Sequence, residues 1–62
     1  MNAHSRSAEL ALIENDMNSL ADVLGAMIER HMANPDPEIV ASLRRAQAKA
    51  RHGAALVRRH RS

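Results

Sequence analysis

Apolar residues recur at helical spacing through the first half of the chain. Between positions 10 and 27 they stand at alternating intervals of three and four residues: Leu10, Ile13, Met17, Leu20, Leu24 and Met27. This is the a/d pattern of a coiled-coil heptad, and strand alternation does not produce it. The pattern predicts a helix over about residues 7–33, capped at its start by the hydroxyl of Ser5 or Ser7. Gly25 costs this helix about 1 kcal/mol relative to alanine, so we expect the backbone of a neighbouring helix to approach closely there.

The second half of the chain has the same period with smaller side chains. Its apolar positions alternate at four and three residues: Ile39, Leu43, Ala46, Ala50, Gly53 and Val57. They predict a helix over about residues 37–59, followed by a basic tail at 60–62. Because large side chains interdigitate well with small ones, we expect Leu20 and Leu24 to lie opposite Ala46 and Ala50.

The two periodic segments are separated by the sequence Asn34-Pro35-Asp36-Pro37. Each proline disfavours helical geometry in the residue before it and removes a backbone donor, so one continuous helix is excluded. The same residues suit a helix start, with Asp36 as the N-cap, Pro37 in the first helical position and Glu38 near the positive end of the helix dipole. We therefore predict a turn at 34–36.

These elements predict an all-α fold, an antiparallel two-helix hairpin that forms a single domain over residues 1–62. A chain this short needs disulfides, a metal, further chains or exceptional packing to be stable, and it contains no cysteine. We expect it to complete a helical bundle, either as a homo-oligomer or with a larger helical protein. The apolar residues outside the two seams are left for that second surface: Leu12, Val23, Ile28, Val40 and Leu56.

The composition bears on the expected location of the protein in the cell. The 62 residues are 45% hydrophobic and 26% charged, with no aromatic residue. No continuous apolar segment resembles a signal peptide or a membrane span, since Glu9, Glu14 and Asp16 interrupt the first apolar stretch. A cytoplasmic protein is expected.

Charge is divided between the two halves. Residues 1–34 carry a net charge of −3 and residues 35–62 a net charge of +5. The basic residues are candidates for binding a polyanion: Arg44, Arg45, Lys49, Arg51, Arg58, Arg59 and Arg61. The alternative is that an acidic helix and a basic helix complement each other inside the hairpin.

Candidate chemistry is sparse. The four histidines do not have the spacing of a zinc site, and the serines lie in no nucleophile motif. No glycine-rich phosphate loop is present. We expect no enzyme activity, no metal and no cofactor.

The turn Asn34-Pro35-Asp36-Pro37-Glu38 between two helices resembles the helix–Pro-x-x-Pro–helix pattern of type III secretion needle subunits, with the prolines closer together. The small hairpin co-chaperones of those subunits look similar in size and layout. The resemblance implies a helical hairpin that works in contact with other secretion-system chains.

The heptads also resemble Rop-like hairpins, which dimerise into four-helix bundles and bind paired RNA loops. Two hypotheses stay open. One is a non-enzymatic protein–protein interaction module, such as a small co-chaperone or an assembly component of a secretion-type complex. The other is a Rop-like homodimeric regulator that binds nucleic acid through the basic face of its second helix.

Overall fold

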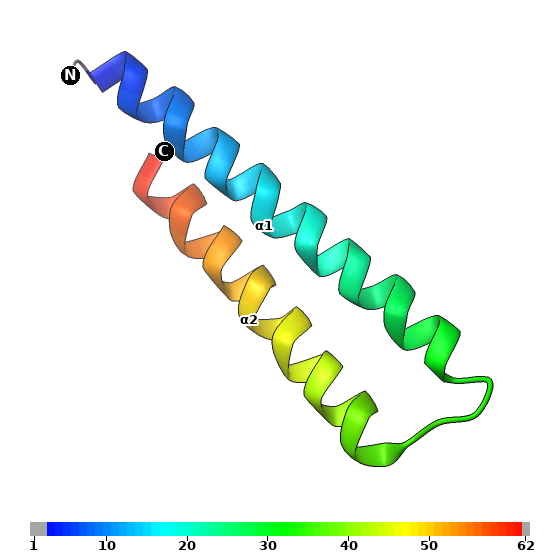
Figure 1. Ribbon diagram of the computed structural model, residues 1–62. Coiled ribbons are helices and arrows are strands. Elements are labelled where there is room, and N and C mark those ends of the chain that lie inside the picture. The colour runs from blue at the N-terminus through cyan, green and yellow to red at the C-terminus, as the bar shows by residue number, and fades with distance from the viewer. Residues whose placement is uncertain (1–2, 62) are drawn as a thin grey trace.

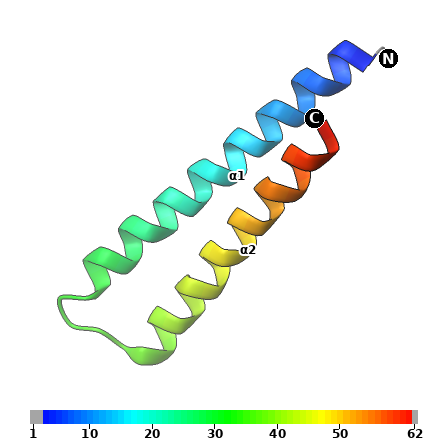
Figure 2. The same cartoon turned by 180° about the vertical axis from the view of Figure 1, so that it is seen from behind.

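The chain forms two helices joined by a short connection (Figure 1). The structure, a computed structural model, describes the backbone of residues 3–61 and the side chains of residues 5–61. Helix α1 spans Ala3–His31 and helix α2 spans Pro37–Arg61, and no strand occurs within this range. The helices run antiparallel, so both ends of the chain lie opposite the turn (Figures 1 and 2). The predicted all-α hairpin is confirmed.

Helix α1 begins and ends earlier than the sequence predicts. It is already helical at Ala3, so the prediction that Ser5 or Ser7 caps it is wrong. It ends at His31, where the Met32 amide is shared between the carbonyls of Ile28 at 3.0 Å and Glu29 at 3.3 Å. Such sharing tightens the last turn of a helix. The connection therefore covers residues 32–36, two more than expected.

Helix α2 begins where the sequence predicts. The Asp36 carboxylate accepts hydrogen bonds from the amides of Glu38 at 2.9 Å and Ile39 at 3.4 Å, as an N-cap does. At its other end, α2 continues through Arg61, so positions 60 and 61 are helical and not a separate tail. Arginine favours helix, and cations complement the negative end of the dipole. Ser62 lies outside the described residues.

A side chain from α1 also holds the start of α2. The Nε2 atom of His31 accepts a hydrogen bond from the Asp36 amide at 3.0 Å. This contact links the last residue of α1 to the cap of α2 and fixes the path of the connection between them. Periodicity places His31 near the seam but does not predict the bond.

The helices approach closely at both glycines. A Cβ atom at Gly25 would lie 2.8 Å from Nε2 of Gln47, and one at Gly53 would lie 2.9 Å from Sδ of Met17. The Gln47 amide occupies the first gap and donates a hydrogen bond to the Ala21 carbonyl at 3.1 Å. The space at Gly25 is therefore filled by a side chain of α2, and the predicted close approach of the neighbouring backbone is not found there.

Small residues form most of the buried seam. Among the described residues the buried ones are Ala21, Ile28, Ala50 and Ala54. The expected a/d seam is wrong at its d positions, because 44% of Ile13, 52% of Leu20 and 39% of Met27 stay exposed. Residues one step later along α1, Ala21 and Ile28, face α2 instead.

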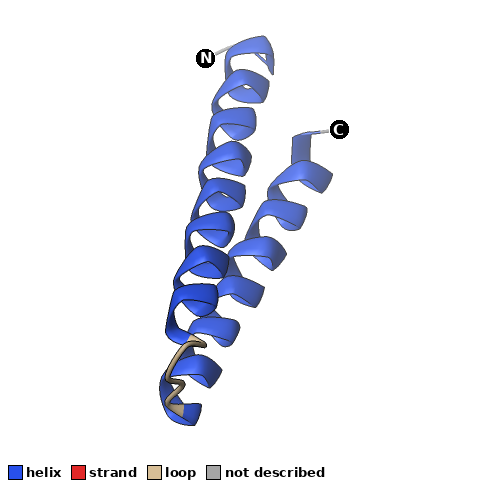
Figure 3. Ribbon diagram, turned by 90° about the vertical axis from the view of Figure 1, so that its right-hand side faces the viewer, coloured by secondary structure: helices blue, strands red, loops and turns tan. Residues whose placement is uncertain are grey.

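The reason for this shift lies in side-chain size. Alanine and glycine on both helices allow a short distance between the helix axes, and the large side chains of Ile13, Leu20 and Met27 stay exposed at the flank of the seam. Ile28, expected on the outer surface, is buried in the seam instead, one position after the exposed Met27. Seen from the side, α2 is inclined to α1, as in other packed helix pairs (Figure 3).

Replacing Asp36 with alanine should lower the free energy of unfolding by about 1 kcal/mol, because two amides of the first turn of α2 lose their acceptor. Asp36→Asn keeps an oxygen in that place and should stay close to the wild type. Chemical denaturation followed by helical circular dichroism measures both variants. Equal stability of Asp36→Ala and the wild type would contradict the capping role.

Candidate functional site

The hairpin carries a row of exposed apolar side chains on one face. Ile13, Leu20 and Met27 recur every seven residues, so they lie along one line of α1 beside the buried seam. Ile39 of α2 is also exposed, over 47% of its surface, and reaches the same face. We call these four residues the apolar stripe.

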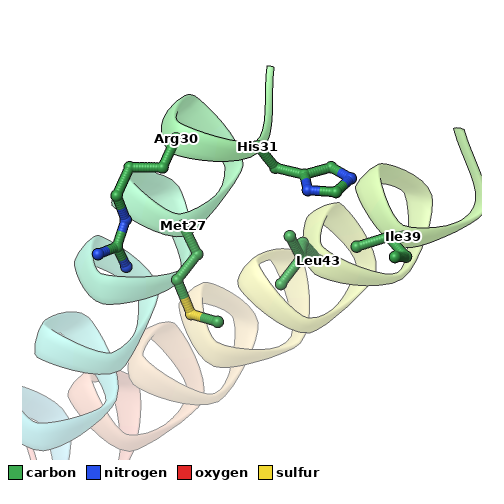
Figure 4. Close-up of a pocket in the computed structure, with 5 residues that line it drawn as sticks. All are labelled: Met27, Arg30, His31, Ile39 and Leu43. Atoms are coloured by element: carbon green, nitrogen blue, oxygen red, sulfur yellow. The ribbon is translucent and has the colours of Figure 1, made fainter. Parts of the chain in front are cut away.

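A surface hollow at the turn end joins the two helices of this face. Its lining comes from both helices: Met27, Arg30, His31, Ile39 and Leu43. The hollow measures about 330 Å³ and is wide open. In Figure 4 the side chains of Met27, Leu43 and Ile39 point into the space between the helices, and Arg30 extends back along α1. The apolar stripe therefore crosses from α1 to α2 at Met27 and Ile39.

The α2 side of the same face is lined by small residues. Ile39, Ala46 and Gly53 recur every seven residues, so a single line leads from the hollow along α2. Ala46 and Gly53 are half-buried, and Gly53 contacts Met17. Large side chains on α1 thus stand next to a line of small residues on α2.

The opposite face of the hairpin is polar. A hollow of about 160 Å³ there is lined by Glu14 and Asn18 of α1 and by Arg51, Ala54, Ala55 and Arg58 of α2. At the open end Nε of Arg61 donates to Oε1 of Glu14 at 2.6 Å, a salt bridge between the helices. Acidic and basic side chains of the two helices meet on this face.

The seven basic candidates do not share one face. All are exposed on α2: Arg44, Arg45, Lys49, Arg51, Arg58, Arg59 and Arg61. Arg44, Arg51 and Arg58 recur every seven residues and follow the polar face beside Glu14. Arg45 donates to the Ser42 hydroxyl at 3.2 Å, and Arg61 is held by Glu14. Lys49 lies between Ala46 and Gly53 on the apolar face.

The predicted core and interface residues divide into two groups. Ala50 is buried in the seam. Six others are half-buried along it: Leu10, Met17, Leu24, Leu43, Ala46 and Val57. The remaining four, Ile13, Leu20, Met27 and Ile39, form the apolar stripe. Sequence reasoning missed Ala21, Ala54 and Gln47 as seam residues. The sequence did contain a signal for Ala54, because Ala50 and Ala54 are four residues apart and form a small-residue pair on one face of α2.

Two kinds of site are not found in the part of the chain that the structure describes. No three histidine, aspartate or glutamate side chains among residues 5–61 converge as they would around a metal ion. Neither α1 nor α2 combines the length and the apolar character that crossing a bilayer requires.

Comparisons with protein-family models, with curated proteins and with solved structures found no match.

The position of the seam can be tested by replacing each of two alanines of α1 with leucine. Ala21→Leu places a large side chain where the helices meet, since Ala21 is 1% exposed, and should cost about 1–3 kcal/mol of unfolding free energy. Ala26→Leu makes the same change at an exposed position and should be nearly neutral. Thermal unfolding followed by circular dichroism compares them, and equal effects would place the seam elsewhere on α1.

Proposed function

We propose that this hairpin is a non-enzymatic protein–protein interaction module and that the apolar stripe is its binding surface. The observation that carries the proposal is the exposure of Ile13, Leu20, Met27 and Ile39 along one face. Contiguous apolar surface of this kind is typical of interaction sites on small soluble proteins.

The stability of the chain supports the same proposal. Three of the four buried residues are alanines, so Ile28 is the only large side chain that is fully buried among the described residues, and the other large seam residues are half-buried. Folding of a chain this small is marginal, because the entropy lost on ordering the backbone is close to the gain from burial. A partner that covers the apolar stripe removes more apolar surface from water and so adds to the free energy of folding. Folding and binding are therefore coupled in this proposal.

The finer assignment is a small co-chaperone or assembly component of a secretion-type complex, acting in the cytoplasm. It is supported by the proline-containing turn between two helices and by a fold that leaves one helix face to other chains. A co-chaperone of this kind acts through contact alone, which suits a surface built from aliphatic side chains and methionine. Methionine adapts to partners of irregular shape.

Isolation of the tagged full-length chain from its source tests the module. Leu20→Lys places a charge in the middle of the apolar stripe and should reduce the native complex by at least tenfold. Leu12→Lys is the matched control, because Leu12 is 66% exposed and lies about 80° around α1 from Leu20, outside the four residues of the stripe. Native mass measurement of the three isolates reads out the complex. If Leu20→Lys left the complex unchanged, the stripe would not be the binding surface.

A second candidate function is nucleic-acid binding by α2. The row of Arg44, Arg51 and Arg58 along the polar face favours it, and the acidic residues of α1 beside that row oppose it. Titration of the purified chain with RNA and DNA at two salt concentrations separates the candidates, because phosphate binding weakens steeply with salt. We expect no salt-sensitive binding. A steep loss of affinity with salt, abolished by Arg51→Gln with Arg58→Gln, would instead establish this second function.

A further inference from the structure

We infer that the apolar stripe is covered by a second copy of this chain, in a two-fold dimer whose turns lie at the same end. In this arrangement α1 of each copy lies on α2 of the other, and the four helices form a bundle. The inference rests on the proposed function, since it names the occupant of the same surface.

The shapes of the two helices on this face are complementary. On α1 the line is large, with Ile13, Leu20 and Met27 standing out from the surface. On α2 the line is small over most of its length, since Ala46 and Gly53 are half-buried and Met17 of the same chain fills the space beside Gly53. A two-fold axis parallel to the long axis of the hairpin places the large line of each copy on the small line of the other. The large side chains of one copy then pack over the small residues of its partner.

Charges on the face are complementary in the same arrangement. Asp16 stands between Ile13 and Leu20 on α1, and Lys49 stands between Ala46 and Gly53 on α2. Both side chains are exposed. Met17 lies opposite Gly53, so Lys49 is level with a position about five residues beyond Asp16 on α1. A two-fold axis along the bundle preserves these levels, and Asp16 of one copy is therefore displaced by about 7 Å along the bundle from Lys49 of the other. An extended lysine side chain covers that distance, and the dimer contains this pair twice.

The other two-fold arrangement, with the turns at opposite ends, lacks both features. It places α1 on α1 and α2 on α2, so Leu20 meets Leu20 while Ala46 faces Gly53 across a gap. It also brings Lys49 of one copy against Lys49 of the other, since the middle of the stripe is level with position 50. Repulsion between like charges and uneven packing both disfavour it.

The available area suits a dimer. From Glu9 to Arg30 the face extends about 32 Å along α1, and two adjacent helices are about 20 Å wide. Each copy can thus bury about 650 Å², or about 1,300 Å² for the pair, which reaches the range of stable specific interfaces. The face covers much of the 50 Å length of the hairpin.

The first experiment measures the mass of the purified full-length chain by sedimentation equilibrium over micromolar to hundred-micromolar concentrations. A species of twice the 6.8 kDa chain mass is expected. Asp16→Lys should weaken the dimer about tenfold, because it removes two ion pairs and adds two repulsive ones. Asp16→Lys combined with Lys49→Asp should return the dissociation constant to within about twofold of the wild type. Both sites are exposed, so these variants keep their helices.

The second experiment determines the arrangement. The chain has no cysteine, so Asn34→Cys accepts a single spin label at the exposed turn. With the turns at the same end the two labels should lie within about 25 Å, since stacked helices are about 10 Å apart. With the turns at opposite ends their separation would approach the 50 Å length of the hairpin. Pulsed electron paramagnetic resonance measures this distance.

The outcomes separate the inference from the proposed function. A monomer at all concentrations, a larger oligomer, a long label distance or a failed charge exchange would each overturn the second-copy arrangement. A monomer whose native complex is still lost in Leu20→Lys would overturn the dimer and leave the interaction module standing. A monomer whose native complex is insensitive to Leu20→Lys would overturn both.

Discussion

The close contact between the two helices, made largely by small side chains, determines most of this structure. Ala21 on α1 and Ala50 and Ala54 on α2 are buried in that contact, and the glycine positions leave room only for the side chains of Gln47 and Met17. A seam built largely from small residues gains dispersion contacts at close range, but it removes little apolar surface from water. Ile28 is buried in it, while Ile13, Leu20 and Ile39 remain on the outer surface. The exposed stripe is a direct consequence of the tight seam.

The turn was the part of the fold that the sequence predicted best. Asp36 and Pro37 act through local rules that need no tertiary context, and the cap forms as those rules require. The His31 contact could not be predicted in the same way, because it depends on where the end of α1 lies relative to the Asp36 amide. That position is set by the seam some distance away. Local chemistry decides where α2 begins, and long-range packing decides what holds the turn.

The seam itself shows where sequence reasoning failed. Heptad positions d and e are consecutive residues, 100° apart on the helix, so Leu20 and Ala21 compete for the same contact. A reading based on hydrophobicity selects leucine, because it gains more from burial. The structure selects alanine, because the residues opposite are small and the helices come close. The a/d pattern of α1 was real, but it marks the edge of the seam and the apolar stripe together. The pattern shows which apolar residues share a face of the helix, and it does not distinguish packing inside the hairpin from exposure at its surface.

The division of charge between the helices acts at more than one level. Inside the hairpin, opposite charge favours the antiparallel pairing of α1 with α2, and the Glu14–Arg61 salt bridge is its visible contact at the open end. Because of the same division, an acidic α1 is attracted to a basic α2 and repelled by another α1. In the dimer that we infer, acidic and basic helices alternate around the bundle axis, because the turns share one end. Charge separation that first selects the hairpin can thus also select the relative orientation of two hairpins, without any further residue being devoted to it.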